Sequence, residues 1–242
     1  MSKFFFRDFT IDQTNSPLKV GTDAILLGAS LEIPKDSTRV LDVGTGTGVI
    51  AMILASRFQH IHVTSIEPNE SAFLDASMNF LNATFSDRLT ISKTTIQDFS
   101  QIELFDIVVT NPPYFLNDLR SSDPEMMQAK HLDEVTFFGF IDACMRHLDQ
   151  YGVFWLILPK AIAEKVVAYM RDKGFNLLHK TRFHSNIKKP DIRWVLAFSL
   201  AQKPKIDEAN ALIEKECMIR NIDGSFHQDY IDLAGYLHAK DL

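Results

Sequence analysis

The sequence predicts an α/β fold built on a mostly parallel sheet of seven strands, with an antiparallel hairpin at one edge. Short apolar runs alternate with segments of helical periodicity over residues 40–173, and several of the runs end in glycine or proline. Two β-rich runs then follow each other without a helix between them. Strands separated by helices pair in parallel, whereas strands in direct succession pair antiparallel.

The individual elements follow from the local pattern in chain order. The apolar run 40–43 stops at glycines and indicates a buried strand, and 48–57 continues with helical spacing and no breaker. Gly174 is placed to cap the last helix of the series. The remaining strands are 62–66, 89–92, 105–110 and 153–158, the remaining helices 71–81, 133–148 and 162–173, and the hairpin pairs 175–183 with 192–200.

Composition excludes several classes of protein. The 242 residues are 46% hydrophobic and 23% charged, which excludes a disordered chain. Glycine and proline show no period and no heptad persists, which excludes collagen and coiled coil. No apolar run approaches the ~18 residues of a membrane helix, and the N-terminus has no secretory signal. We therefore expect a cytoplasmic protein with no membrane contact.

The length suits one domain over residues 1–242. We expect 1–38 to close over the site, 39–160 to carry the cofactor and catalytic motifs, and 161–242 to hold a basic hairpin. Cys144 and Cys217 lie far apart in the chain, and neither they nor the histidines match a metal spacing. We expect buried thiols, no metal and a monomer.

The first motif is a glycine-rich turn between the first strand and its helix. Gly44, Thr45, Gly46 and Gly48 follow the acidic Asp42. Glycines at such a turn let the backbone approach a ligand closely. This Gly-x-Gly-x-Gly spacing suits S-adenosylmethionine better than a dinucleotide, and Asp42 is a candidate partner for the methionine end.

Two further acidic residues fit the same cofactor. Glu67 ends the next strand, where a carboxylate can accept both ribose hydroxyls of an adenosine group. Asp98 precedes the fourth strand and can accept from the adenine amine, while its neighbour Phe99 can line the ring. The order of the motifs along the chain supports both assignments, although a loop aspartate alone is more often a turn residue.

The sharpest motif is Asn111-Pro112-Pro113-Tyr114, directly after the fourth strand. Ligands in open α/β sheets bind beyond the carboxyl ends of the strands. The Asn111 side-chain oxygen and the Pro112 carbonyl can accept from one planar amine, and the prolines stiffen the turn. Tyr114 can stack on an extruded base. Asn111 also counts among the cofactor-binding candidates.

Together, the glycine turn and this motif resemble the amino methyltransferases that modify adenine, guanine or glutamine. The chain further resembles the bacterial valine-tRNA (adenine-N6)-methyltransferase family over essentially its whole length. Lys130 departs from the arginine that this family carries, and the ending 234–237 departs from its aromatic pair. The resemblance rests on residues 4–9, 13, 18–29, 115, 129–131, 186–196, 222–226 and 230.

The resemblance implies a Rossmann-like class I methyltransferase that transfers a methyl group from S-adenosylmethionine to N6 of the adenosine next to the anticodon of a valine tRNA. It places the target adenine at residues 111–114 and the cofactor at the glycine turn, Glu67 and Asp98. It also implies that Lys19, Thr22 and Asp23 close over the site, with helix capping as the alternative.

The sequence motifs are also compatible with other functions. Guanine-N2 methylation of ribosomal RNA shares the Asn-Pro-Pro core, but those enzymes often carry a duplicated N-terminal half, for which 242 residues leave no room. A glutamine methyltransferase of the release-factor type needs a helical domain before Gly44, where only 43 residues stand. A catalytically dead scaffold is disfavoured by the intact Asp42, Glu67, Asp98 and Asn111.

The net charge of −6 argues at first against nucleic acid, but its distribution is uneven. Residues 150–202 carry nine basic groups against three acidic ones. The predicted hairpin within this block holds the candidate RNA-binding residues Lys188, Lys189 and Arg193, with a solvated charged face as the alternative. The total charge therefore does not exclude an RNA substrate.

Overall fold

The structure is a computed structural model that describes residues 3–112, 124–200 and 212–239, except for the side chains of 124–134. Its described part contains one large sheet with the strand order β10-β8-β9-β7-β6-β3-β4-β5. All neighbouring strands in it pair in parallel except at β9, which is antiparallel to β7 and to β8. The strands are β3 (Arg39–Val43), β4 (His62–Ile66), β5 (Leu89–Ser92), β6 (Phe105–Thr110), β7 (Leu148–Pro159), β8 (Asn176–His184), β9 (Asp191–Ser199) and β10 (Ile213–Met218).

The predicted fold class is confirmed, with one additional strand. In the described part of the chain the sheet has eight strands, because β10 pairs in parallel with β8 outside the hairpin. The β8–β9 hairpin therefore lies one strand in from the edge. The sequence of β10, IEKECM, has no apolar run, and its pairing with β8 is long-range, so no local pattern revealed it.

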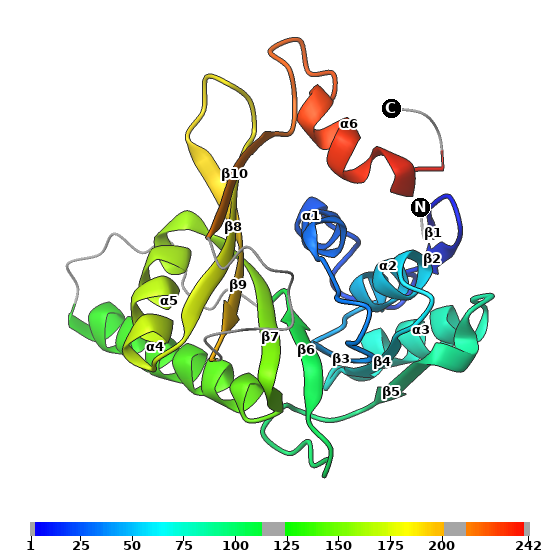
Figure 1. Ribbon diagram of the computed structural model, residues 1–242, viewed down its shortest axis with the longest axis horizontal. Helices are drawn as coiled ribbons and strands as arrows, with labels where there is room; N and C mark the ends of the chain where they lie inside the picture. The colour runs from blue at the N-terminus through cyan, green and yellow to red at the C-terminus, as the bar shows by residue number, and fades with distance from the viewer. Residues whose placement is uncertain (1–2, 113–123, 201–211, 240–242) are drawn as a thin grey trace.

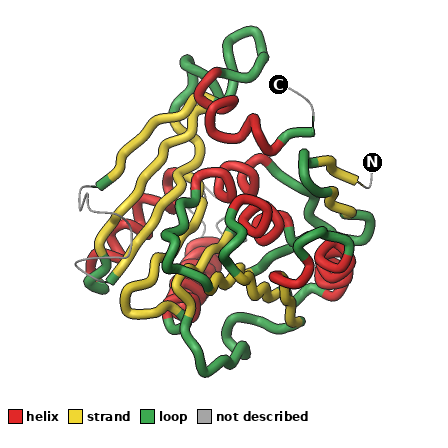
Figure 2. Tube along the Cα trace, turned by 45° about the vertical axis from the view of Figure 1, so that its right-hand side comes forward, coloured by secondary structure: helices red, strands yellow, loops and turns green. Residues whose placement is uncertain are grey.

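Helices cover both faces of the sheet (Figures 1 and 2). Alternate residues of each strand point to opposite faces, so Val40 belongs to one apolar cluster and Leu41 to the other. The first cluster packs α1, α2, α3 and α6, and the second packs α4 and α5. The helices are α1 (Thr22–Ser30), α2 (Val49–Arg57), α3 (Glu70–Leu81), α4 (Pro124–Met145), α5 (Lys160–Asp172) and α6 (Gln228–Ala234).

The N-terminal segment packs against the C-terminal part of the chain near residue 238. A small hairpin of β1 (Lys3–Phe5) and β2 (Thr10–Asp12) precedes α1. Phe6 forms a β-bridge with His238, and the Arg7 N–H donates to the Leu237 carbonyl at 2.9 Å. Residues 6–7 and 237–238 therefore lie side by side, near the N and C marks of Figure 1. These contacts hold the start of the segment that leads through residues 13–21 to α1.

Candidate active site

A cleft of about 720 Å³ opens at the carboxyl ends of β3, β4 and β6. This position and size are typical of a small-molecule site in an open α/β sheet. Its lining combines glycine backbone, a few polar groups and apolar side chains. The cleft is lined by Ser16, Pro17, Leu18, Val43, Gly44, Gly46, Ile66, Glu67, Pro68, Asn69, Ala72, Thr94, Thr95, Ile96, Gln97, Asn111, Pro112, Thr136 and Phe140.

The glycine turn forms one wall of the cleft. The Gly44 and Thr45 N–H groups donate to the Ile66 carbonyl at 2.9 and 3.1 Å, which fixes the turn against the end of β4. Gly44 and Gly46 have φ angles of 70° and 58°, and no atom lies within 4 Å of the position that a Cβ would take in either. The backbone there faces open space, so a ligand can approach it closely.

Gly48 has a different role from its two neighbours. It has a φ of 85° and precedes the first residue of α2. A Cβ there would lie 2.5 Å from Cε1 of Phe80, so this glycine permits close packing of α2 against α3. Gly48 is not among the described lining residues of the cleft.

Two buried carboxylates stand at the strand ends. Asp42 is fully buried and accepts a hydrogen bond from the Thr45 hydroxyl at 2.5 Å. Burial raises the pKa of Asp42 to about 7, against the opposing effect of that hydroxyl. Glu67 is 7% exposed and accepts from the Gly46 N–H at 2.8 Å and the Asn69 N–H at 2.9 Å. A carboxylate has about four acceptor positions, so Glu67 retains capacity for ligand hydroxyls.

A second part of the cleft lining mixes apolar and polar side chains. Ile96 and Gln97 line the cleft from the loop after β5, and Thr136 and Phe140 line it from α4. The predicted pair from this loop lies elsewhere. Asp98 is exposed and accepts from the Thr95 hydroxyl at 2.7 Å, and Phe99 packs against Phe105 and His147. Neither is among the described lining residues, so the adenine role given to this loop stays a prediction.

Strand β6, which precedes the Asn111 motif, is hydrogen-bonded to the end of β3, where the glycine turn begins. The Thr110 hydroxyl at the end of β6 donates to the Val43 carbonyl at 2.9 Å. The next two residues, Asn111 and Pro112, line the cleft, and Pro112 is buried. Pro113 and Tyr114 lie outside the described residues, as do Phe115 and the side chains of Lys130 and His131.

The N-terminal segment forms a strap across the cleft. Ser16, Pro17 and Leu18 line the cavity, and Leu18 is 73% exposed. The Lys19 ammonium donates to the carbonyls of Gln13 and Ser16 at 2.5 and 3.0 Å. Lys19 thus fixes the curvature of the strap from outside, and it is not a described lining residue.

Two residues of α3 that sequence reasoning missed anchor this strap. The Asp75 carboxylate accepts from the Asn15 and Ser16 N–H groups at 2.9 and 2.7 Å and from the Asn15 amide. Asn79 accepts from the Asp12 N–H and donates to the carbonyls of Asp12 and Thr47. Both side chains are buried, at 5% and 3% exposure. The signal in the sequence is the spacing of Asp75 and Asn79, which lie four residues apart in the predicted helix 71–81 and so share one face of it.

The remaining predicted residues lie near the end of the sheet that carries β8 and β9. Thr22 begins α1, and Asp23 in the first turn of that helix accepts from Nε of Arg193 at 2.7 Å. Arg193 is therefore held in an ion pair, while Lys188 and Lys189 are exposed in the β8–β9 turn. None of these residues is among the described lining of the cleft.

Comparison with known proteins agrees with this fold. The methyltransferase small domain family matches residues 17–176. Among solved structures, a predicted O-methyltransferase from Agrobacterium tumefaciens has a TM-score of 0.65 at 19% identity, over 90% of this chain and 98% of that chain. The glycopeptide N-methyltransferase MtfA, solved with S-adenosyl-L-methionine, has a TM-score of 0.55 at 16% identity, over 76% and 89% of the two chains. The chain is thus a methyltransferase with a Rossmann-like fold.

Relatives in sequence narrow this class. A tRNA1(Val) (adenine(37)-N6)-methyltransferase of Pedobacter heparinus is 37% identical, over 83% of this chain and 86% of its own length. Proteins of the same name from Proteus mirabilis and Vibrio parahaemolyticus are 33% and 31% identical, over 92% and 98% of this chain and 88% and 95% of their own lengths. The chain belongs to the tRNA1(Val) (adenine(37)-N6)-methyltransferase family, as its resemblance predicted.

No described helix is long and apolar enough to cross a membrane. No group of three or more His, Cys, Asp or Glu side chains in the described part could hold a metal ion.

Proposed function

We propose that this chain methylates N6 of an adenosine in tRNA, the adenosine next to the anticodon of a valine tRNA, with S-adenosylmethionine as methyl donor. The observation that carries the proposal is the position of Asn111 and Pro112, which line the same cleft as the open glycine turn. Family membership supports the choice of base and RNA, since the relatives are named for adenine 37 of tRNA1(Val). Neither ribosomal RNA nor protein is favoured as a substrate by any feature of the cleft.

The residues present fit S-adenosylmethionine. Gly44 and Gly46 leave open space where any side chain would intrude, and Glu67 offers acceptors for ribose hydroxyls. Ile96 and Phe140 of the lining suit the adenine ring, and Asp42, next to the lining residue Val43, is proposed to accept from the methionine ammonium. When bound, the cofactor would supply an electrophilic methyl group on a sulfonium, with a neutral thioether as the leaving group.

The protein's part in the reaction is positioning and electrostatics. The side-chain oxygen of Asn111 and the carbonyl of Pro112 are proposed to accept the two N–H groups of the adenine amine. The amine lone pair is delocalised into the ring, and two acceptors favour the form in which positive charge develops on nitrogen. Holding the amine in line with the methyl carbon lowers the entropic part of the barrier, and the surplus proton leaves to solvent after transfer.

The working unit and compartment are also proposals. We propose a cytoplasmic monomer that contacts tRNA directly, without a metal. The cysteines Cys144 and Cys217 are free and buried, and burial raises the pKa of Cys217 to about 12. Thiols in this state are unreactive, in keeping with a reducing compartment.

The test is mass spectrometry of nucleosides from tRNA that lacks the modification, after incubation with the protein and S-adenosylmethionine. We expect N6-methyladenosine in valine tRNA and none in the Asn111→Ala variant. Parallel reactions with ribosomal RNA and with protein substrates serve as controls. Methyl transfer to guanine or to protein, with tRNA unmodified, would overturn the proposal.

A further inference from the structure

Two turns of the C-terminal part meet above one end of the sheet. The first is the β8–β9 turn, residues 185–190, and the second follows β10, residues 219–227. The Ile219 and Arg220 N–H groups donate to the carbonyls of His184 and Ser185 at 2.9 and 3.1 Å. These two bonds place the start of the second turn beside the first, and both turns lie at the top of Figure 1, in yellow and orange.

The cations below these turns are already paired. Lys180 lies 3.3 Å from Glu214, and Arg182 lies 2.5 Å from Glu216, both across the β8–β10 pair. The extra strand therefore pairs two of the basic groups that the sequence places in the hairpin. Arg193 is likewise paired, with Asp23.

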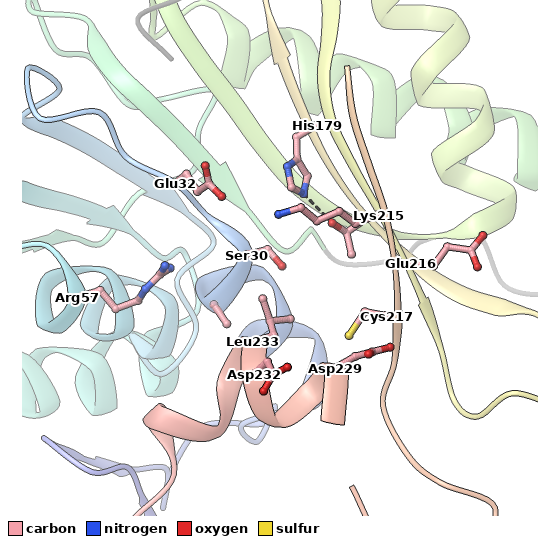
Figure 3. A pocket seen from close by; sticks show the side chains of 12 residues that line it. Ser30, Glu32, Arg57, His179, Lys215, Glu216, Cys217, Asp229, Asp232 and Leu233 are labelled. Atoms are coloured by element: carbon pink, nitrogen blue, oxygen red, sulfur yellow. Dashed lines mark hydrogen bonds between the residues drawn. The ribbon is translucent and has the colours of Figure 1, made fainter. Parts of the chain in front are cut away.

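Lys215 of β10 is directed into a side cavity instead. Figure 3 shows its ammonium extending towards His179, in a cavity of about 350 Å³ whose walls also carry Asp229 and Asp232. Lys215 thus lines a cavity beside β10 and lies before the turn that follows this strand, so it is not part of the surface formed by the two turns.

The cations at the tip differ from those below it. Lys188, Lys189 and Arg220 are exposed, and no ion pair joins them to a carboxylate among the described residues. Arg220 is also preorganised, because its guanidinium lies 4.3 Å from the centre of the Phe226 ring and donates to the Gly224 carbonyl at 2.6 Å. We call these three residues the tip surface.

The tip surface lies on the side of the sheet where the carboxyl ends of β6 and β7 lie, the same side as Asn111. Thr110 is level with Leu156 and Leu196, and Arg193 is level with Pro159, three residues further along β7. With ~3.3 Å per residue and ~4.8 Å per strand, Arg193 lies about 10 Å beyond and about 10 Å beside Thr110. The tip is on the order of 20 Å from the strand end, roughly six nucleotide steps of a stacked strand.

We propose that the tip surface binds the phosphate backbone of the tRNA arm whose adenosine enters the cleft, and that Arg193, Lys180 and Arg182 act in the fold instead. This inference rests on the proposed function. Free, exposed cations release counterions when they meet phosphates, whereas cations already paired to carboxylates gain little. Bases of a loop are read where they are splayed out, so contacts to the adjoining backbone supply affinity and register.

The test measures tRNA affinity at several salt concentrations for the wild type and for a variant with Lys188→Glu, Lys189→Glu and Arg220→Glu. We expect the logarithmic salt dependence to become shallower by about three, and affinity at low salt to fall on the order of 100-fold. A matched control reverses Lys35, Arg171 and Lys165, which are exposed elsewhere. Calorimetry of cofactor binding shows that each variant is folded.

The outcomes separate the two proposals. If the wild type binds tRNA steeply with salt but the tip variant keeps its slope and affinity, the tip surface is not the RNA contact. An equal loss in the tip variant and the control also overturns it, because net charge alone would then explain the effect. If the wild type neither binds nor methylates tRNA, it is the proposed function that fails.

Discussion

The cleft and the tip surface are built in opposite ways. In the cleft, position is fixed by backbone and buried groups: Glu67 accepts two main-chain N–H groups, and Thr110 ties β6 to the end of β3. At the tip, Lys188 and Lys189 project from a turn and are fixed by few contacts. The shape of the cleft selects its ligand, whereas exposed positive charge without an ion-pair partner selects the ligand of the tip surface.

This difference orders the expected effects of substitution. Changes in the cleft act on the reacting atoms or on the cofactor, so they are steep and insensitive to salt. Changes among the surface cations act through screened charge, so they are graded and depend on salt. A salt-dependent effect of a cleft substitution, or a salt-independent effect of a substitution at a surface cation, would contradict this comparison.

Asn111→Ala has the largest expected effect. Loss of one acceptor for the developing charge on the amine is expected to lower kcat by about 10²–10³. Cofactor affinity by calorimetry should change little, because the amide is proposed to face the target base. A loss of cofactor affinity equal to the loss of turnover would move Asn111 to the cofactor side of the cleft.

Glu67→Gln is expected to come next. Charge-assisted hydrogen bonds contribute about 1.5–3 kcal/mol each, so cofactor affinity should fall on the order of 10–100-fold. Calorimetry against the matched control Glu164→Gln, an exposed residue of α5, isolates the effect. Unchanged affinity would show that Glu67 serves only to hold the turn at Gly46.

Asp75→Asn tests the strap. The carboxylate accepts two backbone N–H groups of the strap, and an amide that replaces it presents one oxygen fewer. We expect a loss of roughly 10-fold in cofactor affinity with a smaller change in global stability, measured beside Asp87→Asn as an exposed control. A fall in melting temperature with unchanged affinity would assign Asp75 to the fold alone.

The fold and the cleft follow from the sequence to different depths. Short apolar runs predict the strands 40–43 and 105–110, which agree with the structure, and Asn111 directly after the second of them lines the cleft. The roles of Asp75 and Asn79 could not be predicted, because their hydrogen-bond partners in the N-terminal segment lie about 60 residues away in the chain. The ion pair of Lys180 with Glu214 could not be predicted for the same reason. A count of charges along the chain does not show which groups meet across neighbouring strands.

A smaller effect is expected in the pH dependence of cofactor binding. The pKa of Asp42 is raised from 3.8 to about 7 in the folded protein, so the group is protonated below pH 7 and ionised above it. An ionised carboxylate favours the methionine ammonium, so affinity should rise with pH up to about 7 and then level.

Asp42→Asn should remove that rise. The same shift has the opposite sign for stability: the raised pKa stabilises the fold most below pH 4, and this contribution falls as pH rises through 7. Thermal unfolding of the wild type and the variant between pH 5 and 8 measures this second effect. Parallel pH profiles for the two proteins would show that Asp42 does not titrate in this range.

Lys180→Gln has the smallest expected effect and draws the boundary of the tip surface. Lys180 is paired with Glu214, and its ammonium lies 4.4 Å from the centre of the Trp194 ring. Partly exposed pairs contribute about 0–1 kcal/mol, so unfolding free energy should fall by that amount or less. The salt dependence of tRNA binding should stay as in the wild type, because this charge is already neutralised. A slope shallower by about one would mean that RNA displaces Glu214, and the contact would then extend down β8.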